Sequence, residues 1–286
     1  MTPDDAPPLP PGRPLELAGR GVTFVRDCGP GSGDPARPPL LLLHGWTVTA
    51  DLNFFHAYPV LTAAGHRVVA LDHRGHGRGI RPPDGRVRLS DCADDAAAVL
   101  DRLGIERALV VGYSMGGLVA QLLWKRHPER VAGLVFGSTA ARIPVGPVGL
   151  LWQGGRDPVA GWARRAGRRT DAWVRSRVVR RVADGDRHER WMRSEYLRGD
   201  GVGIISALGS LSRFSSEGWI DALDRPAATV VTLADTVVPP GRQRDLARRC
   251  GAPIVTVDAP HDAIVSHHRR YLPRLLRAVD DVTRRI

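Results

Sequence analysis

A serine flanked by glycines is the clearest sign of chemistry in this sequence. The segment Gly112-Tyr-Ser-Met-Gly116 fits the pattern Gly-x-Ser-x-Gly, which in the right setting marks a nucleophile. A serine on a tight strand-to-helix turn adopts strained dihedral angles, and a glycine two residues to each side prevents backbone clashes. The setting agrees, because an apolar run ends at Val111 and a helical pattern begins near Met115. We therefore predict that Ser114 is a nucleophile rather than part of an ordinary glycine-rich loop.

A serine nucleophile that attacks a carbonyl also needs backbone N–H groups to bind the oxyanion of the tetrahedral intermediate. His44-Gly-Trp46 directly follows the apolar run Leu40–Leu43. The Trp46 N–H is the candidate donor, paired with the Met115 N–H just after the serine. We expect the Trp46 side chain to face the pocket. His44 is expected to pack and form hydrogen bonds in the turn, not to act as a base.

A sheet must bring these groups together, and the hydrophobic pattern predicts one. Short apolar runs, typical of strands buried on both faces, alternate with helical patterns. This alternation predicts an α/β fold with a mostly parallel, doubly wound sheet and helices on both faces. The expected strands are residues 40–43, 68–71, 108–111, 134–136, 229–233 and 254–257. The expected helices are residues 52–64, 89–103 with Ser90 as its cap, 118–126, 241–250 and 268–282.

The strand pattern also predicts the domain boundaries. Residues 15–27 are expected to form an antiparallel hairpin at the sheet edge that turns near residues 19–21. No convincing strand lies between Phe136 and Ala228, where apolar residues follow helical spacing. We expect a disordered, Pro-rich lead-in at 1–14, a core at 15–138 and 226–286, and a helical, Arg-rich cap at 139–225.

The predicted cap is the most basic part of the chain. Residues 140–199 hold 14 arginines against six acidic residues, within a net charge of +11 for the whole protein. Three interpretations stay open: a solvated helical face under a coding bias, attraction of an anionic substrate, or peripheral contact with anionic lipid. In the third, Trp162 and Trp173 would dip into the lipid.

The composition excludes several other classes of protein. Lys125 is the only lysine among 41 basic residues, which indicates a coding bias more than a phosphate-binding surface, so we expect no nucleic-acid partner. Three widely spaced cysteines, Cys28, Cys92 and Cys250, predict neither a disulfide framework nor a zinc site. No apolar run is long enough to span a membrane, and the first residues lack a signal-peptide pattern. A cytoplasmic location is therefore expected.

These motifs together resemble the α/β-hydrolase superfamily, specifically serine esterase- and lipase-like members with an HGW-type oxyanion loop. The resemblance covers about residues 15–138 and 226–285, nearly everything except the insertion. Asp72-His-Arg-Gly-His-Gly77 is similar to the family's Asp-x-Arg-Gly-x-Gly loop after the fourth strand. The resemblance implies a structural role for this loop, so its polar side chains are expected to shape it rather than to bind a metal.

The resemblance also implies the other two members of a catalytic triad. The family's acid lies after the seventh strand in a Gly-x-x-Asp-x-x-Val-Pro pattern, which Asp235 matches although the glycine is absent. The family's histidine lies in the loop after the last strand, which His261 matches although Pro260 replaces the usual glycine. The order Ser114, Asp235, His261 agrees with this superfamily.

The expected function is that of a serine hydrolase that cleaves a carboxylic ester of a small or medium acyl substrate through an acyl-enzyme on Ser114. His261 would be the general base and Asp235 its orienting acid, and no metal or organic cofactor is needed. A thioesterase, a carbon–carbon bond hydrolase or a non-catalytic ligand-binding relative stay open as alternatives. The serine argues against the relatives that use an aspartate nucleophile, the epoxide hydrolases and haloalkane dehalogenases. The oligomeric state is not predicted.

Overall fold

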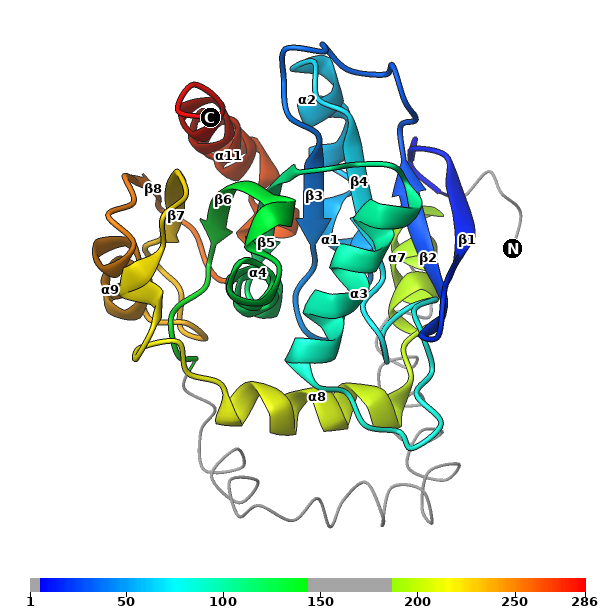
Figure 1. Ribbon diagram of the computed structural model, residues 1–286. Coiled ribbons are helices and arrows are strands. Elements are labelled where there is room, and N and C mark those ends of the chain that lie inside the picture. The colour runs from blue at the N-terminus through cyan, green and yellow to red at the C-terminus, as the bar shows by residue number, and fades with distance from the viewer. Residues whose placement is uncertain (1–5, 144–186) are drawn as a thin grey trace.

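The computed structural model describes residues 6–143 and 187–286, and it is built on one eight-stranded sheet (Figure 1). The strand order is β1-β2-β4-β3-β5-β6-β7-β8; β3 to β8 run parallel to one another, while β2 is antiparallel to both β1 and β4. The strands are β1 Gly12–Leu17, β2 Gly21–Asp27, β3 Leu40–Leu43, β4 Val68–Leu71, β5 Ala108–Tyr113, β6 Val131–Gly137, β7 Ala227–Thr232 and β8 Ile254–Val257.

Helices cover both faces of this sheet. The α-helices are α1 Ala50–Phe54, α2 Ala57–Ala63, α3 Leu89–Arg102, α4 Met115–Arg126, α7 Arg187–Tyr196, α8 Gly201–Arg213, α9 Pro240–Arg249, α10 Ala263–Ser266 and α11 His268–Thr283. Two short 3₁₀ helices are η2 Pro128–Arg130 and η3 Ile220–Ala222. The mostly parallel α/β fold predicted from the sequence is confirmed.

The two-sided burial explains why the central strands are so apolar. All four residues of β3 are fully buried, and alternate residues belong to different cores. Leu41 and Leu43 pack with residues of α3 and α4, whereas Leu40 and Leu42 pack with residues of α2 and α11. Burying one leucine side chain contributes about 1.5–3 kcal/mol. The sheet is therefore a rigid platform whose carboxyl-end loops carry the polar residues.

One predicted helix and one predicted helix cap differ from those observed. The helix expected over 52–64 is two helices, because Pro59 in α2 lacks an N–H and its ring clashes with the carbonyl oxygen four residues earlier. The prediction that Ser90 caps α3 is also wrong, since the N-cap residue is Arg88 and its side chain makes no capping bond. The N–H of Leu89 instead donates to Ser210 Oγ of α8, at 3.1 Å.

The N-terminal boundary also moves. Strand β1 begins at Gly12, so the last three residues of the lead-in expected to be disordered belong to the sheet. Backbone pairing explains this, because Gly12 to Leu17 pair with Arg26 to Gly21 in an antiparallel register. The hairpin turns where predicted, and Gly19 adopts a φ of 69° that favours glycine.

The described part of the predicted cap comprises residues 139–143 and 187–225. It contains α7, α8 and η3, and no strand occurs within these residues. Helix α8 lies at the lower end of the molecule in Figure 1, beneath α3 and α4. Trp162, Trp173 and most of the Arg-rich segment lie outside the described residues. Within the described ranges, no helix is both long and apolar enough to cross a membrane.

Candidate active site

Ser114 lies on the turn between β5 and α4. Its φ of 53° is in the left-handed region, where a residue with a side chain is strained. Its N–H donates to the carbonyl oxygen of Gly137 at 2.9 Å, which ties the turn to β6. A Cβ on Gly116 would overlap the backbone of Leu43 in β3, and one on Gly112 would overlap the backbone of Gly116. The predicted steric reason for both glycines therefore holds in the structure.

His261 connects Ser114 with Asp235. It lies between β8 and α10, with its Nε2 2.9 Å from Ser114 Oγ and its Nδ1 2.8 Å from Asp235 Oδ2. An ionised carboxylate only accepts hydrogen bonds, so Nδ1 carries the proton and Nε2 accepts from the serine hydroxyl. The Tyr113 hydroxyl donates to the carbonyl oxygen of His261. Tyr113, the last residue of β5, therefore holds the histidine beside the serine that follows it in the chain.

Asp235 follows β7, and its carboxylate is nearly enclosed. Its Oδ1 accepts the N–H groups of Val237 at 2.9 Å and Val238 at 2.8 Å. Its Oδ2 accepts from the Thr232 hydroxyl at 2.9 Å and the Gln243 amide at 3.0 Å, besides His261. Burial alone would raise the pKa of this carboxyl group, but His261 and the other donors outweigh it and hold the pKa below its usual value.

The predicted oxyanion donors flank the serine. Met115 is the first residue of α4, and the loop with Trp46 follows β3, which neighbours β5 in the sheet. A Cβ built on Gly45 would lie 3.5 Å from Ser114 Cβ, so this loop approaches the nucleophile closely. The roles of the Trp46 and Met115 N–H groups stay predictions. The indole Nε1 of Trp46 donates to the carbonyl oxygen of Ile204 in α8 at 2.8 Å.

His44 is buried and belongs to the scaffold. Its Nδ1 donates to the carbonyl oxygen of Gly45 at 2.7 Å, and its Nε2 accepts the N–H of His73 at 2.9 Å. Burial lowers the pKa of His44 to about 4, so the ring is neutral at pH 7. Asp72 likewise shapes its loop, because its carboxylate accepts the N–H groups of Ala50 and Arg78, both at 2.8 Å. No residue cluster suited to hold a metal occurs in the described parts of the chain.

The comparison with protein families settles the membership of the chain. The model of the alpha/beta hydrolase fold family matches residues 38–268, which include Ser114, Asp235 and His261. The chain belongs to the α/β-hydrolase family.

Several curated relatives of this α/β-hydrolase share part of its sequence. Epoxide hydrolase B of Mycobacterium tuberculosis is 37% identical over 124 residues, which are 43% of this chain and 34% of the relative. The 2-hydroxymuconate semialdehyde hydrolase of Pseudomonas sp. (strain CF600) is 40% identical over 134 residues, 46% of this chain and 45% of the relative. Rhodomycin D methylesterase DauP of Streptomyces sp. (strain C5) is 41% identical over 109 residues, 36% of each chain. The matches thus span less than half the length of these relatives.

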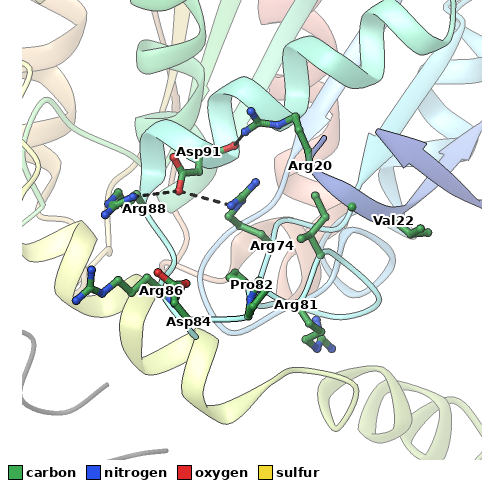
Figure 2. A pocket seen from close by; sticks show the side chains of 12 residues that line it. Arg20, Val22, Arg74, Arg81, Pro82, Asp84, Arg86, Arg88 and Asp91 are labelled. Atoms are coloured by element: carbon green, nitrogen blue, oxygen red, sulfur yellow. Dashed lines mark hydrogen bonds and ion pairs between the residues drawn. The ribbon is translucent and has the colours of Figure 1, made fainter. Parts of the chain in front are cut away.

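A cavity of about 360 Å³ in this α/β-hydrolase family member lies away from the candidate triad, none of whose members lines it. Figure 2 shows it between the β1–β2 turn, the loop after β4 and the start of α3. Several of its arginines already have acceptors: Arg20 and Arg74 bind Asp95, and Arg81 donates to backbone carbonyl groups. We therefore regard this cavity as part of the structural scaffold and not of the candidate active site.

Two residues that support the site did not emerge from the sequence pattern, Thr232 and Gln243. Gln243 is fully buried in α9, and its amide oxygen accepts the N–H of Thr232 at 3.1 Å while its amide nitrogen donates to Val238 and Asp235. One signal was available. Gln243 shares a helix face with Leu246 and Ala247, so a polar residue was present on the apolar face of a predicted helix.

Proposed function

We propose that this α/β-hydrolase cleaves carboxylic esters with small or medium acyl groups through an acyl-enzyme on Ser114. One observation carries the proposal: the unbroken hydrogen-bond chain from Asp235 through His261 to Ser114, with contacts of 2.8 and 2.9 Å. A base within hydrogen-bond reach of a hydroxyl, itself oriented by a carboxylate, is the arrangement that activates serine.

The proposed reaction begins with attack of Ser114 Oγ on the carbonyl carbon while His261 Nε2 takes the hydroxyl proton. The carbonyl oxygen becomes an oxyanion bound by the N–H groups of Trp46 and Met115. The ester C–O bond then breaks, and the leaving alkoxide takes the proton from His261. Water attacks the acyl carbon, gives its proton to His261, and the carboxylic acid leaves as Ser114 regains its proton. Asp235 stabilises the imidazolium in both halves of the reaction.

The relatives support ester cleavage in part. The similarity to rhodomycin D methylesterase favours an ester, and the similarity to 2-hydroxymuconate semialdehyde hydrolase favours carbon–carbon cleavage as the second candidate. Both reactions suit the same serine, base and oxyanion donors. Epoxide opening through a carboxylate nucleophile does not suit position 114, because a serine hydroxyl stands there.

A substrate panel tests this proposal. We expect p-nitrophenyl esters of graded chain length to be hydrolysed faster than acyl-CoA thioesters or a dienol substrate for carbon–carbon cleavage. A Ser114→Ala variant should lose at least roughly 10³-fold in kcat. A serine-directed phosphonate should label Ser114, as read by peptide mass spectrometry. Activity that survives the substitution would remove Ser114 from the mechanism, and a faster dienol reaction would favour the second candidate.

A further inference from the structure

Two long-range hydrogen bonds tie the loop that carries Trp46 to the described cap helices. The Trp46 indole N–H donates to the carbonyl oxygen of Ile204 in α8 at 2.8 Å. Three residues further on, the Thr49 hydroxyl donates to Glu195 Oε2 in α7 at 3.1 Å. The loop after β3 is thus held by two different helices of the segment inserted after β6.

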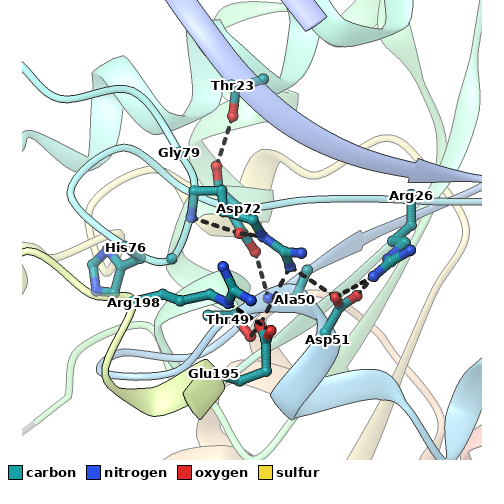
Figure 3. A network of polar contacts seen from close by, with 12 residues as sticks. Thr23, Arg26, Thr49, Ala50, Asp51, Asp72, His76, Gly79, Glu195 and Arg198 are labelled. Atoms are coloured by element: carbon teal, nitrogen blue, oxygen red, sulfur yellow. Dashed lines mark hydrogen bonds and ion pairs between the residues drawn. The ribbon is translucent and has the colours of Figure 1, made fainter. Parts of the chain in front are cut away.

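The Glu195 carboxylate that accepts this hydrogen bond is buried and has two further donors. Glu195 is only 3% exposed, and its carboxylate also accepts from Arg78 Nη2 at 3.3 Å and Arg198 Nε at 2.7 Å. Figure 3 shows the Glu195 carboxylate close to Thr49 and Arg198. Removing a partner from a buried charge is strongly destabilising, so this carboxylate is held in place. A hydroxyl that donates to it is fixed as well.

Arg78 extends this contact into the core. Its Nη2 lies 2.7 Å from Asp51 Oδ2, and its Nε lies 3.2 Å from Asp72 Oδ2. Asp72 also accepts the N–H of Ala50, the residue that follows Thr49, at 2.8 Å. The end of the Trp46 loop is therefore bound on one side by the loop after β4 and on the other by α7.

The middle of the same loop is strained. Thr47 has a φ of 70°, and a β-branched residue in the left-handed region is a true outlier. Such strain persists only where the surroundings determine the conformation. The N–H of Gly45 donates to Asn53 Oδ1 at 2.8 Å, which fixes the loop on the other side of Trp46. Among the described residues, no hydrogen bond uses the backbone N–H of Trp46.

We propose that the side chains of Trp46 and Thr49 are positioning groups that hold the Trp46 backbone N–H where an oxyanion on the acylated serine forms. The cap helices α7 and α8 therefore contribute to transition-state stabilisation without touching the reacting atoms. This inference rests on the proposed serine mechanism, since it requires an oxyanion. It adds that the loop stays in its strained form only while Ile204 and Glu195 accept its two hydrogen bonds.

The decisive variant is Trp46→Phe, which keeps an aromatic ring and removes the donor to Ile204. Trp124→Phe is the matched control, because the Trp124 indole N–H also donates a hydrogen bond, to Asp224 Oδ1 at 3.0 Å. Trp124 lies in the last turn of α4, whereas Ser114 precedes the first turn. On the ester that the panel identifies, we expect Trp46→Phe to lower kcat about 10- to 100-fold with KM within about two-fold, because losing a whole oxyanion donor costs about 10²–10³. Trp124→Phe should keep the kcat of the unaltered enzyme.

A second pair and a second readout complete the test. Thr49→Val removes the hydroxyl, and Thr49→Ser restores it; we expect kcat to fall in the first and to recover in the second. A trifluoromethyl ketone, whose adduct with serine carries an oxyanion, should bind at least about ten-fold more weakly to Trp46→Phe, with KM for the ester unchanged. Equal losses in the two tryptophan variants, or unaltered kcat and ketone affinity in Trp46→Phe, would overturn the inference. If Trp46→Phe does not fold, the Thr49 pair decides. Absent phosphonate labelling of the unaltered enzyme would instead reject the proposed function itself.

Discussion

Asp235 accepts more hydrogen bonds than the orientation of one histidine requires. Two backbone N–H groups occupy Oδ1, while a hydroxyl, an amide and the imidazole of His261 share Oδ2. Charge-assisted bonds of this kind favour the ionised carboxylate, which explains the direction of its pKa. The donors therefore fix both the charge of Asp235 and the oxygen that faces His261.

Gln243→Glu tests this account at the scale of one residue. The change is isosteric, but it replaces a donor 3.0 Å from Asp235 with a second carboxyl group. Two adjacent carboxylates repel each other when both are ionised. One of them therefore tends to bind a proton, and the folded-state pKa of the pair rises. A raised folded pKa stabilises the fold at low pH, and this contribution is lost as the pH rises. We expect the variant to lose about 1–3 kcal/mol of unfolding free energy relative to the unaltered protein at pH 8, and less at pH 5.

Urea unfolding of both proteins at the two pH values measures this difference. An equal loss at pH 5 and pH 8 would mean that Gln243 acts by packing alone.

The sequence identified Ser114, Asp235 and His261 as a candidate triad because each lies in a recognisable local pattern. It did not identify Gln243, because a buried amide on α9 acquires its meaning only when the helix packs against the turn after β7.

At the scale of elements, the turn from β5 into α4 is confined by its neighbour β3. The space that a side chain at Gly116 would need is occupied by the carbonyl group of Leu43, which is backbone and cannot rotate away. The glycine pattern therefore reflects how closely two adjacent elements approach each other. The turn from β5 into α4 requires these glycines, whatever the substrate.

Gly116→Ala should destabilise the protein by about 3 kcal/mol or more, since overpacking against fixed backbone forces the elements apart. Gly241→Ala is the matched control: it lies in the first turn of α9, and a Cβ there meets no atom within 4 Å. The control should be neutral or stabilising by about 0.5–1 kcal/mol, because alanine loses less backbone entropy in a helix. Thermal unfolding of both variants tests the contrast, and equal melting temperatures would contradict it.

The elements were predictable where local pattern decides them. Runs buried on both faces marked β3 and β4 at their observed ends. The start of α3 was predicted at its observed residue, Leu89, but its capping was not predictable, because its first N–H bonds to Ser210, which lies 121 positions later in α8. The positions of α7 and α8 against the loop after β3 depend on equally distant contacts, such as Trp46 with Ile204. Local sequence therefore specified the sheet better than the packing of the insertion against it.

At the scale of the whole molecule, three buried histidines make the stability depend on pH. His44, His73 and His76 lie together in the core, with ring centroids 4.4 and 5.4 Å apart for the two pairs that include His44. Burial lowers the pKa of His44 to about 4 and that of His76 to about 3, and it also lowers the pKa of His73. Each ring is thus neutral in the folded protein near pH 5 but charged in the unfolded chain.

This difference predicts how stability depends on pH. Between the folded and unfolded pKa values the unfolded chain binds more protons, so stability rises with pH and is lost as the pH falls from about 6.5 toward 4. His44 alone accounts for a loss of about 2 kcal/mol between pH 7 and pH 5, since one pKa unit corresponds to about 1.4 kcal/mol. The net charge of +11 acts in the same direction through self-repulsion. Glu195 acts in the opposite direction, because burial raises its pKa.

We therefore expect the urea midpoint, followed by tryptophan fluorescence, to be clearly lower at pH 5 than at pH 7. His44→Gln separates the cause from general acid sensitivity. It should be less stable than the unaltered protein at pH 7, because the bonds to Gly45 and His73 are lost or weakened. It should also lose less stability between pH 7 and pH 5, because one buried group no longer takes up a proton on unfolding. A variant with the full pH dependence of the unaltered protein would show that His44 is not among the groups responsible.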